Sequence, residues 1–404
     1  MRMNHRRATT LALSLFASTA LPAGAGGAGG AGGGAREPAY ATALRPRLRQ
    51  LADELLVPGG VVLVRSPQLG DWTMVFGTRS RGGGDPVQLG DHVRVGSNTK
   101  TWTGTVILQL VQEGRLRLDT PIGEYRPEVP NGRSITIAQL LEMRSGLFNY
   151  TETVEMNRIL DDDPAYAFAP EELLALAFAR PPYFPPGQAF YYSNTNTVLL
   201  GLLIEQLTGR PVAQEFQTRL FAPLGLRNTL LPARTSTALP APYARGYMYG
   251  TNVETVSSQV LPEAQQAAAR AGTLAPYDQT SVNPSWAWTA GSGISTAEDL
   301  ARFVPALVAG GLLAAPLQRQ RLDSIRPRDP SDPASPGYGY GLAQFGPMYG
   351  HTGELPGYNS FMGHDPVRQN TVVTWTNLNA APDGRAPAIE LARTIIGELA
   401  GAGG

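Results

Sequence analysis

The order of strand and helix patterns along the chain is the feature that most constrains its fold. Short runs of β-branched and aromatic residues predict strands at 60–64, 72–76, 348–352, 359–363 and 371–376. The long stretch between these two groups of strands alternates amphipathic segments with loops rich in Pro and Gly. Strands at both ends with helices between them predict one α/β (α+β) domain built from both ends of the chain, with an all-α subdomain inserted into it.

Helical periodicity sets the boundaries of these parts. Helices are predicted at 101–113, 139–143, 170–180, 196–207, 295–306 and 386–399. Gly114 fits the C-terminal cap of the first helix, and the spacing of Ser295 and Glu298 predicts a capping box. We therefore expect the α/β domain at 40–114 and 286–402, and the helical subdomain at 115–285.

The N-terminal residues have the pattern of an export signal. Three arginines within the first seven residues precede an apolar run at 11–21, which is too short to span a bilayer. This order predicts a signal peptide at 1–25, followed by a Gly/Ala-rich flexible segment at 26–39. We expect a secreted protein without a membrane span, located on the cell-wall side of the membrane. The signal fits export by either the general or the twin-arginine route.

Composition excludes several classes of function. The chain has 33 basic and 33 acidic residues, so its charge favours neither nucleic acid nor an anionic membrane as a partner. It has no cysteine, which excludes disulfides, thiolate nucleophiles and thiolate metal ligands. Its four histidines show no H-E-x-x-H spacing. We expect no metal and no cofactor, and a nucleophile that is not sulfur.

One motif supplies an oxygen nucleophile. Ser97 and Lys100 form S-x-x-K at the start of the predicted helix at 101–113, and this spacing places hydroxyl and amine on one helix face. A serine hydroxyl attacks an acyl group only if a base takes its proton, and an amine does so only when it is neutral. Partial burial would lower the pKa of Lys100 enough for that role. Taken alone, the motif also fits an ordinary surface Ser and Lys.

Two further motifs offer polar groups. Tyr192 and Asn194 lie just before the predicted helix at 196–207, where the tyrosine could move a proton and the amide could hold a substrate carbonyl. They also fit a loop tyrosine beside a helix-capping asparagine. His351, Thr352 and Gly353 lie on a predicted strand, where glycine lets a substrate backbone approach closely.

In this order and at these separations, the three motifs resemble the signature S-x-x-K, Y-x-N and [KH]-T-G. That signature belongs to the penicillin-binding D-alanyl-D-alanine carboxypeptidases and the class C β-lactamases. The resemblance covers nearly all of the chain after the signal. It implies the β-lactamase/DD-peptidase fold, an antiparallel sheet flanked by helices plus a helical subdomain, with the active site between them.

The resemblance also implies roles for individual residues. Ser97 would be the nucleophile, Lys100 its general base, and Tyr192 a proton donor to the leaving group. Asn194 would bind the substrate amide. The backbone amides of Ser97 and Glu354 would form the oxyanion hole.

The remaining implied positions line the cleft. His351 and Thr352 would form its far wall. Trp286 stands where the family has an aromatic residue at the cleft, and a core role fits it equally well. His92 has no counterpart in the family and is interpreted as structural.

Two departures from the family pattern concern the substrate. Many of the peptidases carry an arginine shortly before the third motif to bind the terminal carboxylate, whereas residues 341–344 contain none. Glu354 follows Gly353 where close relatives have a small hydroxyl residue. Both departures predict that peptide acids are poorer substrates than esters or amides.

The first hypothesis for function is a monomeric, penicillin-binding D-alanyl-D-alanine carboxypeptidase that acts on peptidoglycan peptides through an acyl-enzyme at Ser97. A β-lactamase, an esterase or a D-amino-acid amidase would carry almost the same motifs. An inactive protein that binds the cell wall is the alternative without enzymatic activity, and it would leave the joint presence of Ser97, Lys100 and Tyr192 unexplained.

Overall fold

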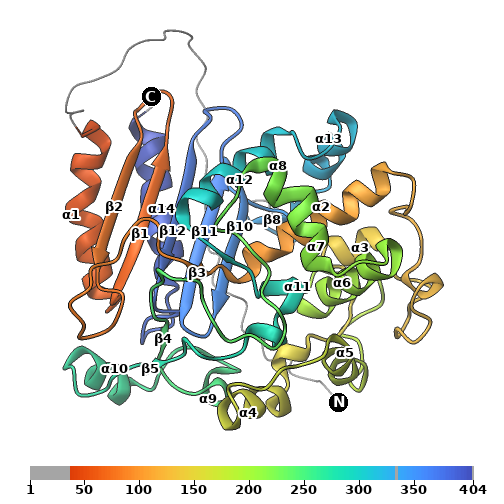
Figure 1. Ribbon diagram of the computed structural model, residues 1–404, viewed down its shortest axis with the longest axis horizontal. Coiled ribbons are helices and arrows are strands. Elements are labelled where there is room, and N and C mark those ends of the chain that lie inside the picture. The colour runs from red at the N-terminus through yellow and green to blue at the C-terminus, as the bar shows by residue number, and fades with distance from the viewer. Residues whose placement is uncertain (1–36, 333–334, 403–404) are drawn as a thin grey trace.

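The computed structural model describes residues 37–332 and 335–402 (Figure 1). The predicted signal peptide and most of the Gly/Ala-rich segment lie outside the described residues. The fold centres on an eight-stranded sheet in the order β2-β1-β12-β11-β10-β9-β8-β7, in which every neighbouring pair is antiparallel. Strands from the two ends of the sequence therefore lie side by side, since β1 pairs with β12.

The five predicted strands are all present in this sheet. Its members are β1 (Gly59–Arg65), β2 (Trp72–Gly77), β7 (Arg326–Pro327), β8 (Gly337–Tyr338), β9 (Ala343–Phe345), β10 (Met348–Leu355), β11 (Tyr358–His364) and β12 (Thr371–Thr376). The short strands β7, β8 and β9 extend the sheet beyond what the sequence predicted. Two small ladders pair β3 (Val93–Arg94) with β6 (Ile294–Ser295), and β4 (Tyr247–Met248) with β5 (Tyr277–Asp278).

Helices cover both faces of the sheet because the strands are apolar on both sides. On β1, Val62 and Val64 pack with α1 (Ala39–Glu54) and α14 (Pro387–Ala402). Val61 and Leu63 point to the other face and join a core with α2 (Thr99–Gln112) and α12 (Ala297–Ala309). This alternation is the two-residue period of a strand, and it fixes the register of β1 in the sheet.

The segment between the two groups of strands is mainly helical. Its helices are α3 (Ile137–Leu141), α4 (Val154–Asp162), α5 (Pro170–Phe178), α6 (Asn194–Thr208), α7 (Val212–Phe216), α8 (Ala222–Leu224), α9 (Asn252–Thr255) and α10 (Glu263–Arg270), and α11 (Trp288–Gly291) and α13 (Ala315–Asp323) follow it. The small β4–β5 ladder lies in this segment, which is therefore not purely helical. One core runs from the sheet into these helices, and the division into two domains stays a prediction.

Of the two helix caps predicted from the sequence, one is present and one is not. Gly114 adopts φ +71° after α2, and the amides of Gly114 and Arg115 bond back to the last turn, as predicted for a C-terminal cap. The capping box at Ser295 is wrong. Thr296 caps α12 by accepting a hydrogen bond from the amide of Asp299, because Ser295 is held in β6.

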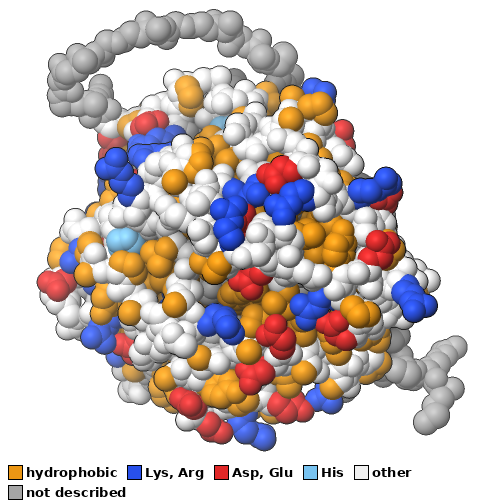
Figure 2. Space-filling view, turned by 45° about the vertical axis from the view of Figure 1, so that its right-hand side comes forward, with side chains coloured by type: hydrophobic (Ala, Val, Ile, Leu, Met, Phe, Trp, Pro, Cys, Tyr) orange, Lys and Arg blue, Asp and Glu red, His pale blue; other side chains and the backbone are white. Residues whose placement is uncertain are grey.

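The surface mixes charges of both signs. Figure 2 shows Arg side chains interspersed with Asp and Glu, with hydrophobic side chains scattered between them. Within the described part of the chain, no helix has the length and apolar character needed to cross a membrane.

Candidate active site

Ser97 lies in a single turn of 3-10 helix, Gly96–Asn98, which leads directly into α2. Hydrogen bonds hold this turn in place. Asn98 Nδ2 donates to Val95 O and to Ser360 Oγ of β11, and Thr99 Oγ1 donates to Gly96 O. Gly96 has φ +56°, and a Cβ there would come within 2.4 Å of the backbone nitrogen of Glu354. Glycine is therefore required for this turn to approach β10.

Lys100 is the second residue of α2, and its buried amine contacts three oxygen atoms. Its Nζ lies 2.9 Å from Ser97 Oγ, 2.6 Å from Asn194 Oδ1 at the start of α6, and 2.8 Å from the carbonyl of Ala290 in α11. The amide oxygen and the carbonyl can only accept hydrogen bonds. A neutral amine that donates to both of them presents its lone pair to the Ser97 hydroxyl.

The environment favours that neutral amine. Burial lowers the pKa of Lys100 well below its ordinary value. Tyr192 closes the site, with its ring centroid 4.7 Å from Lys100 Nζ and its hydroxyl hydrogen-bonded with Ser97. Burial raises the pKa of Tyr192, so its phenol stays protonated. The site thus places a neutral amine and a protonated phenol within hydrogen-bond distance of one hydroxyl.

His351 is buried on β10 as a neutral side chain. Its Nδ1 lies 2.6 Å from Thr352 O and its Nε2 lies 3.2 Å from the hydroxyl of Tyr338 on β8. Burial, and secondarily the nearby Lys100, lower the pKa of His351 to about 3. The carbonyl only accepts, so Nδ1 carries the proton and Nε2 accepts from Tyr338. His351 is therefore a wall of the site and not a base at neutral pH.

The rest of β10 brings its backbone to the nucleophile. Its pairing with β9 ends at Gly350, so the edge beyond that residue is left without a neighbouring strand in the described chain. A Cβ on Gly353 would lie 1.9 Å from Val95 O, which shows how tightly this strand packs on the Ser97 turn. The amide of Glu354 faces the same turn through the contact at Gly96.

The side chain of Glu354 is partly exposed at the site. Its Oε1 accepts a hydrogen bond from Gln259 Nε2, and it pairs with no Lys, Arg or His among the described residues. Burial raises the pKa of Glu354 to about 7. The carboxylate in turn raises the pKa of Tyr192, which places it within electrostatic reach of the site.

Arg328 enters the site from a segment in which the sequence indicated no functional residue. Its guanidinium carbon lies 5.5 Å from the ring centre of Phe190 and 5.8 Å from that of Tyr338. Its Nε is buried without a hydrogen-bond partner, and its side chain forms no ion pair with the described residues. Its charge lowers the pKa of both Tyr192 and His351. Arg328 therefore lies near Tyr192.

The remaining predicted site residues differ in their placement. Thr352 is buried on β10 next to His351. Trp286 is partly exposed, packs against the main core and accepts a hydrogen bond from Tyr150 at its backbone carbonyl. His92 is buried and lies 2.9 Å from the carbonyl of Pro242 through Nδ1, consistent with a structural role.

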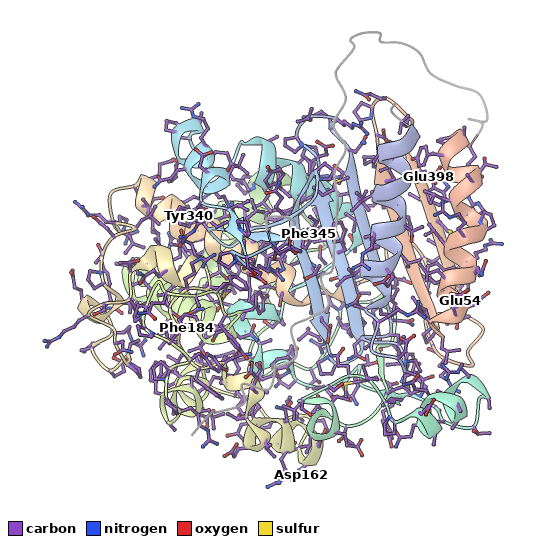
Figure 3. The ribbon with its side chains drawn as sticks, turned by 180° about the vertical axis from the view of Figure 1, so that it is seen from behind. Glu54, Asp162, Phe184, Tyr340, Phe345 and Glu398 are labelled. Carbon is purple, nitrogen blue, oxygen red and sulfur yellow. The ribbon has the colours of Figure 1, made fainter. Side chains whose placement is uncertain are left out.

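Sequence reasoning missed Arg328, Tyr338 and Gln259. They belong to a sheet edge of two-residue strands and to loops, where no motif marked them. The motif residues come from both the sheet and the helical segment. In Figure 3, Phe345 on β9 marks the sheet and Phe184 marks the helical segment.

The fold and the site define a serine hydrolase of the penicillin-recognising type, with nucleophile and lysine on one helix. The model of the family described as Beta-lactamase matches residues 44–394. The chain belongs to this family.

Known relatives in the family differ in their named activities. Penicillin-binding protein 4 of Amycolatopsis lactamdurans is 27% identical over 88% of this chain and 89% of its own length. Esterase EstB of Burkholderia gladioli is 27% identical over 75% of this chain and 76% of its own length. The chain spans only 61% of the length of PbpX of Bacillus subtilis, at 25% identity.

Solved structures show the same fold. A D-stereospecific amidohydrolase from Streptomyces is 31% identical, with a TM-score of 0.71 over 86% of this chain and 96% of its own. The D-amino acid amidase from Ochrobactrum anthropi SV3, complexed with L-phenylalanine amide, is 25% identical, with a TM-score of 0.74 over 89% of this chain and 100% of its own.

Proposed function

We propose that the protein forms an acyl-enzyme at Ser97 and hydrolyses the bond after a D-amino-acid residue. The observation that carries this proposal is the hydrogen-bond pattern of Lys100, whose two acceptor-only partners aim its lone pair at the Ser97 hydroxyl. The low pKa of the buried amine supports the same role.

The proposed reaction has two acyl transfers. Lys100 takes the proton of Ser97 as Oγ bonds to the acyl carbon, and the amides of Ser97 and Glu354 hold the resulting oxyanion, which typically lowers the barrier by about 3 kcal/mol for each donor. The bond to the leaving group breaks, Tyr192 supplies its proton, and the proton held by Lys100 restores the phenol of Tyr192. Water then attacks the ester and gives a proton to Lys100, and that proton passes to Ser97 Oγ as the acid product leaves.

The charge of Arg328 favours a D-alanyl-D-alanine carboxypeptidase. Tyr192 protonates the leaving group in this scheme, and Arg328 lies beside Tyr192 with no acidic partner among the described residues. A terminal carboxylate on the leaving residue would therefore meet a cation there. Arg328 supplies the charge that residues 341–344 lack.

A D-amino-acid amidase is the second candidate. It is supported by the unpaired carboxylate of Glu354, which would repel a carboxylate placed next to it, and by the two amide hydrolases that share the fold. An amide substrate carries no charge on its leaving group. A carboxypeptidase therefore requires the charge of Arg328, whereas an amidase does not.

The experiment compares D-alanyl-D-alanine with D-alanine amide on the native protein, Arg328→Gln and Ser97→Ala. We expect Ser97→Ala to lose turnover and covalent labelling by fluorescent penicillin. We expect Arg328→Gln to lower kcat/KM for the acid by about 10-fold or more, as loss of a charged hydrogen bond does, while the rate for the amide changes little. Equal losses on both substrates would contradict the carboxylate role, and a labelled Ser97→Ala protein would contradict the nucleophile.

A further inference from the structure

Among residues 37–332 and 335–402, no cationic side chain lies within hydrogen-bond distance of the Glu354 carboxylate. Its hydrogen-bond partner is the neutral amide of Gln259, and no cationic side chain of the described residues pairs with it. Keeping a carboxylate partly buried without a cation is unfavourable, and such a group at a cleft is typical of a binding site.

The position of Glu354 indicates which part of the substrate its carboxylate would meet. Its backbone amide lies against the Gly96–Ser97 turn, where the oxyanion of the acyl group would be held. In an amino acid, the α-nitrogen lies about 2.5 Å from the carbonyl carbon. An acyl residue attached to Ser97 therefore carries its α-amino group close to residue 354.

The opposite charge lies near Tyr192. Arg328 packs against the rings of Phe190 and Tyr338 and acts on Tyr192, the residue proposed to protonate the leaving group. The carboxylate of Glu354 and the backbone amide proposed to hold the oxyanion belong to the same residue. We therefore assign this carboxylate to the acyl residue of the substrate. In the proposed reaction, the site thus presents a negative group to the acyl residue and a positive group to the leaving residue.

We propose that Glu354, held by Gln259, binds a free α-ammonium group on the acyl residue of the substrate. This inference rests on the proposed function and narrows its substrate class. It selects D-amino-acid amides and D,D-dipeptides with an unblocked amino group, and it disfavours peptides in which that nitrogen is acylated, including stem peptides of peptidoglycan.

The test compares D-alanine p-nitroanilide with its N-acetyl derivative, which differ only in the charge and size at the amino group. On the native protein we expect kcat/KM to be at least about 10-fold higher for the free amine, the range expected for a charged hydrogen bond. Glu354→Gln keeps the shape of the side chain and removes its charge, so we expect the ratio to fall towards one, mainly through KM of the free amine.

Glu54→Gln is the matched control. Glu54 is an exposed residue at the end of α1, which lies beyond β2 on the opposite side of the molecule from α2 and α6 (Figure 1), and its substitution should leave the ratio unchanged. A native protein that hydrolyses the acetylated substrate as well as the free amine overturns the inference and leaves the acyl-enzyme intact. A preference that survives in Glu354→Gln also overturns it. Failure to hydrolyse either substrate overturns the proposed function itself.

Discussion

At the scale of single residues, the most informative fact is that Lys100 is the only lysine in 404 residues, because every other basic side chain is arginine. Arginine keeps its charge under all ordinary conditions, whereas the amine of lysine is neutralised by burial. Lys100 is therefore the one basic side chain of the chain, apart from histidine, that can accept a proton from a hydroxyl at neutral pH.

This uniqueness allows a direct measurement. Protein labelled with ¹³C-lysine should give one side-chain resonance, and we expect its titration midpoint well below 10.5 because burial disfavours the charged amine. The acylation rate should rise with pH through the same midpoint, since only the neutral amine acts as the base. Lys100→Arg keeps a cation that cannot lose its proton, and acylation should slow by about 10²–10⁴-fold. A normal lysine midpoint, or near-native acylation by Lys100→Arg, would show that another group takes the proton.

At the scale of elements, the sequence predicted long, strongly patterned segments and missed short or interrupted ones. The runs that became β1 and β12 are rich in apolar and β-branched residues, so their pattern alone identified them. β10 and β11 also contain polar residues, but each is seven or eight residues long and carries enough apolar and aromatic residues to be predicted as a strand. The two- and three-residue strands β7, β8 and β9 are defined by pairing with one another, and β9 joins them to β10. Helix α1 was not predicted, and it contains Pro46, which normally interrupts a helix.

The same distinction explains which residues of the site could be predicted from the sequence. Ser97 and Lys100 could be predicted because their geometry follows from one helix, and Tyr192 and His351 because they belong to recognised motifs. Arg328 reaches the cleft through the packing of its side chain on aromatic rings from distant segments. No local pattern encodes such a contact.

The close approach of β10 to the Ser97 turn gives the prediction at this scale. A methyl group on Gly353 would meet the backbone of Val95 at 1.9 Å, so Gly353→Ala must displace the strand that carries the oxyanion amide. We expect the free energy of unfolding to fall by about 1–3 kcal/mol, as for other overpacked positions, together with a loss of kcat/KM. Both can be measured by denaturant titration and steady-state kinetics.

Gly397→Ala is the internal control for this substitution. Gly397 lies in α14, is exposed, and a methyl group added there would have no other atom within 4 Å. Alanine there should stabilise the helix by up to about 1 kcal/mol and leave turnover unchanged. If Gly353→Ala behaved like Gly397→Ala, β10 would not be locked against the nucleophile turn.

At the scale of the whole molecule, one hydrophobic core joins the sheet to the inserted helices. It includes Val61 of β1, Trp102 of α2, Leu199 of α6 and Trp375 of β12, which come from three separate regions of the sequence. Neither part can separate from the other without exposing this shared core to water.

We therefore expect a single cooperative unfolding transition in which helical signal, tryptophan environment and turnover are lost together. Circular dichroism, fluorescence and residual activity during one thermal scan would measure the three. A helical transition that precedes the loss of tryptophan signal would show instead that the predicted subdomain at 115–285 unfolds on its own.

The hydrogen bonds of Lys100 also have a consequence during protein synthesis. Its partners Asn194 and Ala290 lie 94 and 190 residues further along the sequence. A growing chain on the ribosome thus contains Ser97 and Lys100 long before the residues that desolvate the amine have been made. Until then the lysine remains in water, charged and unable to take a proton, so the nascent protein carries its nucleophile in an inert form for most of translation.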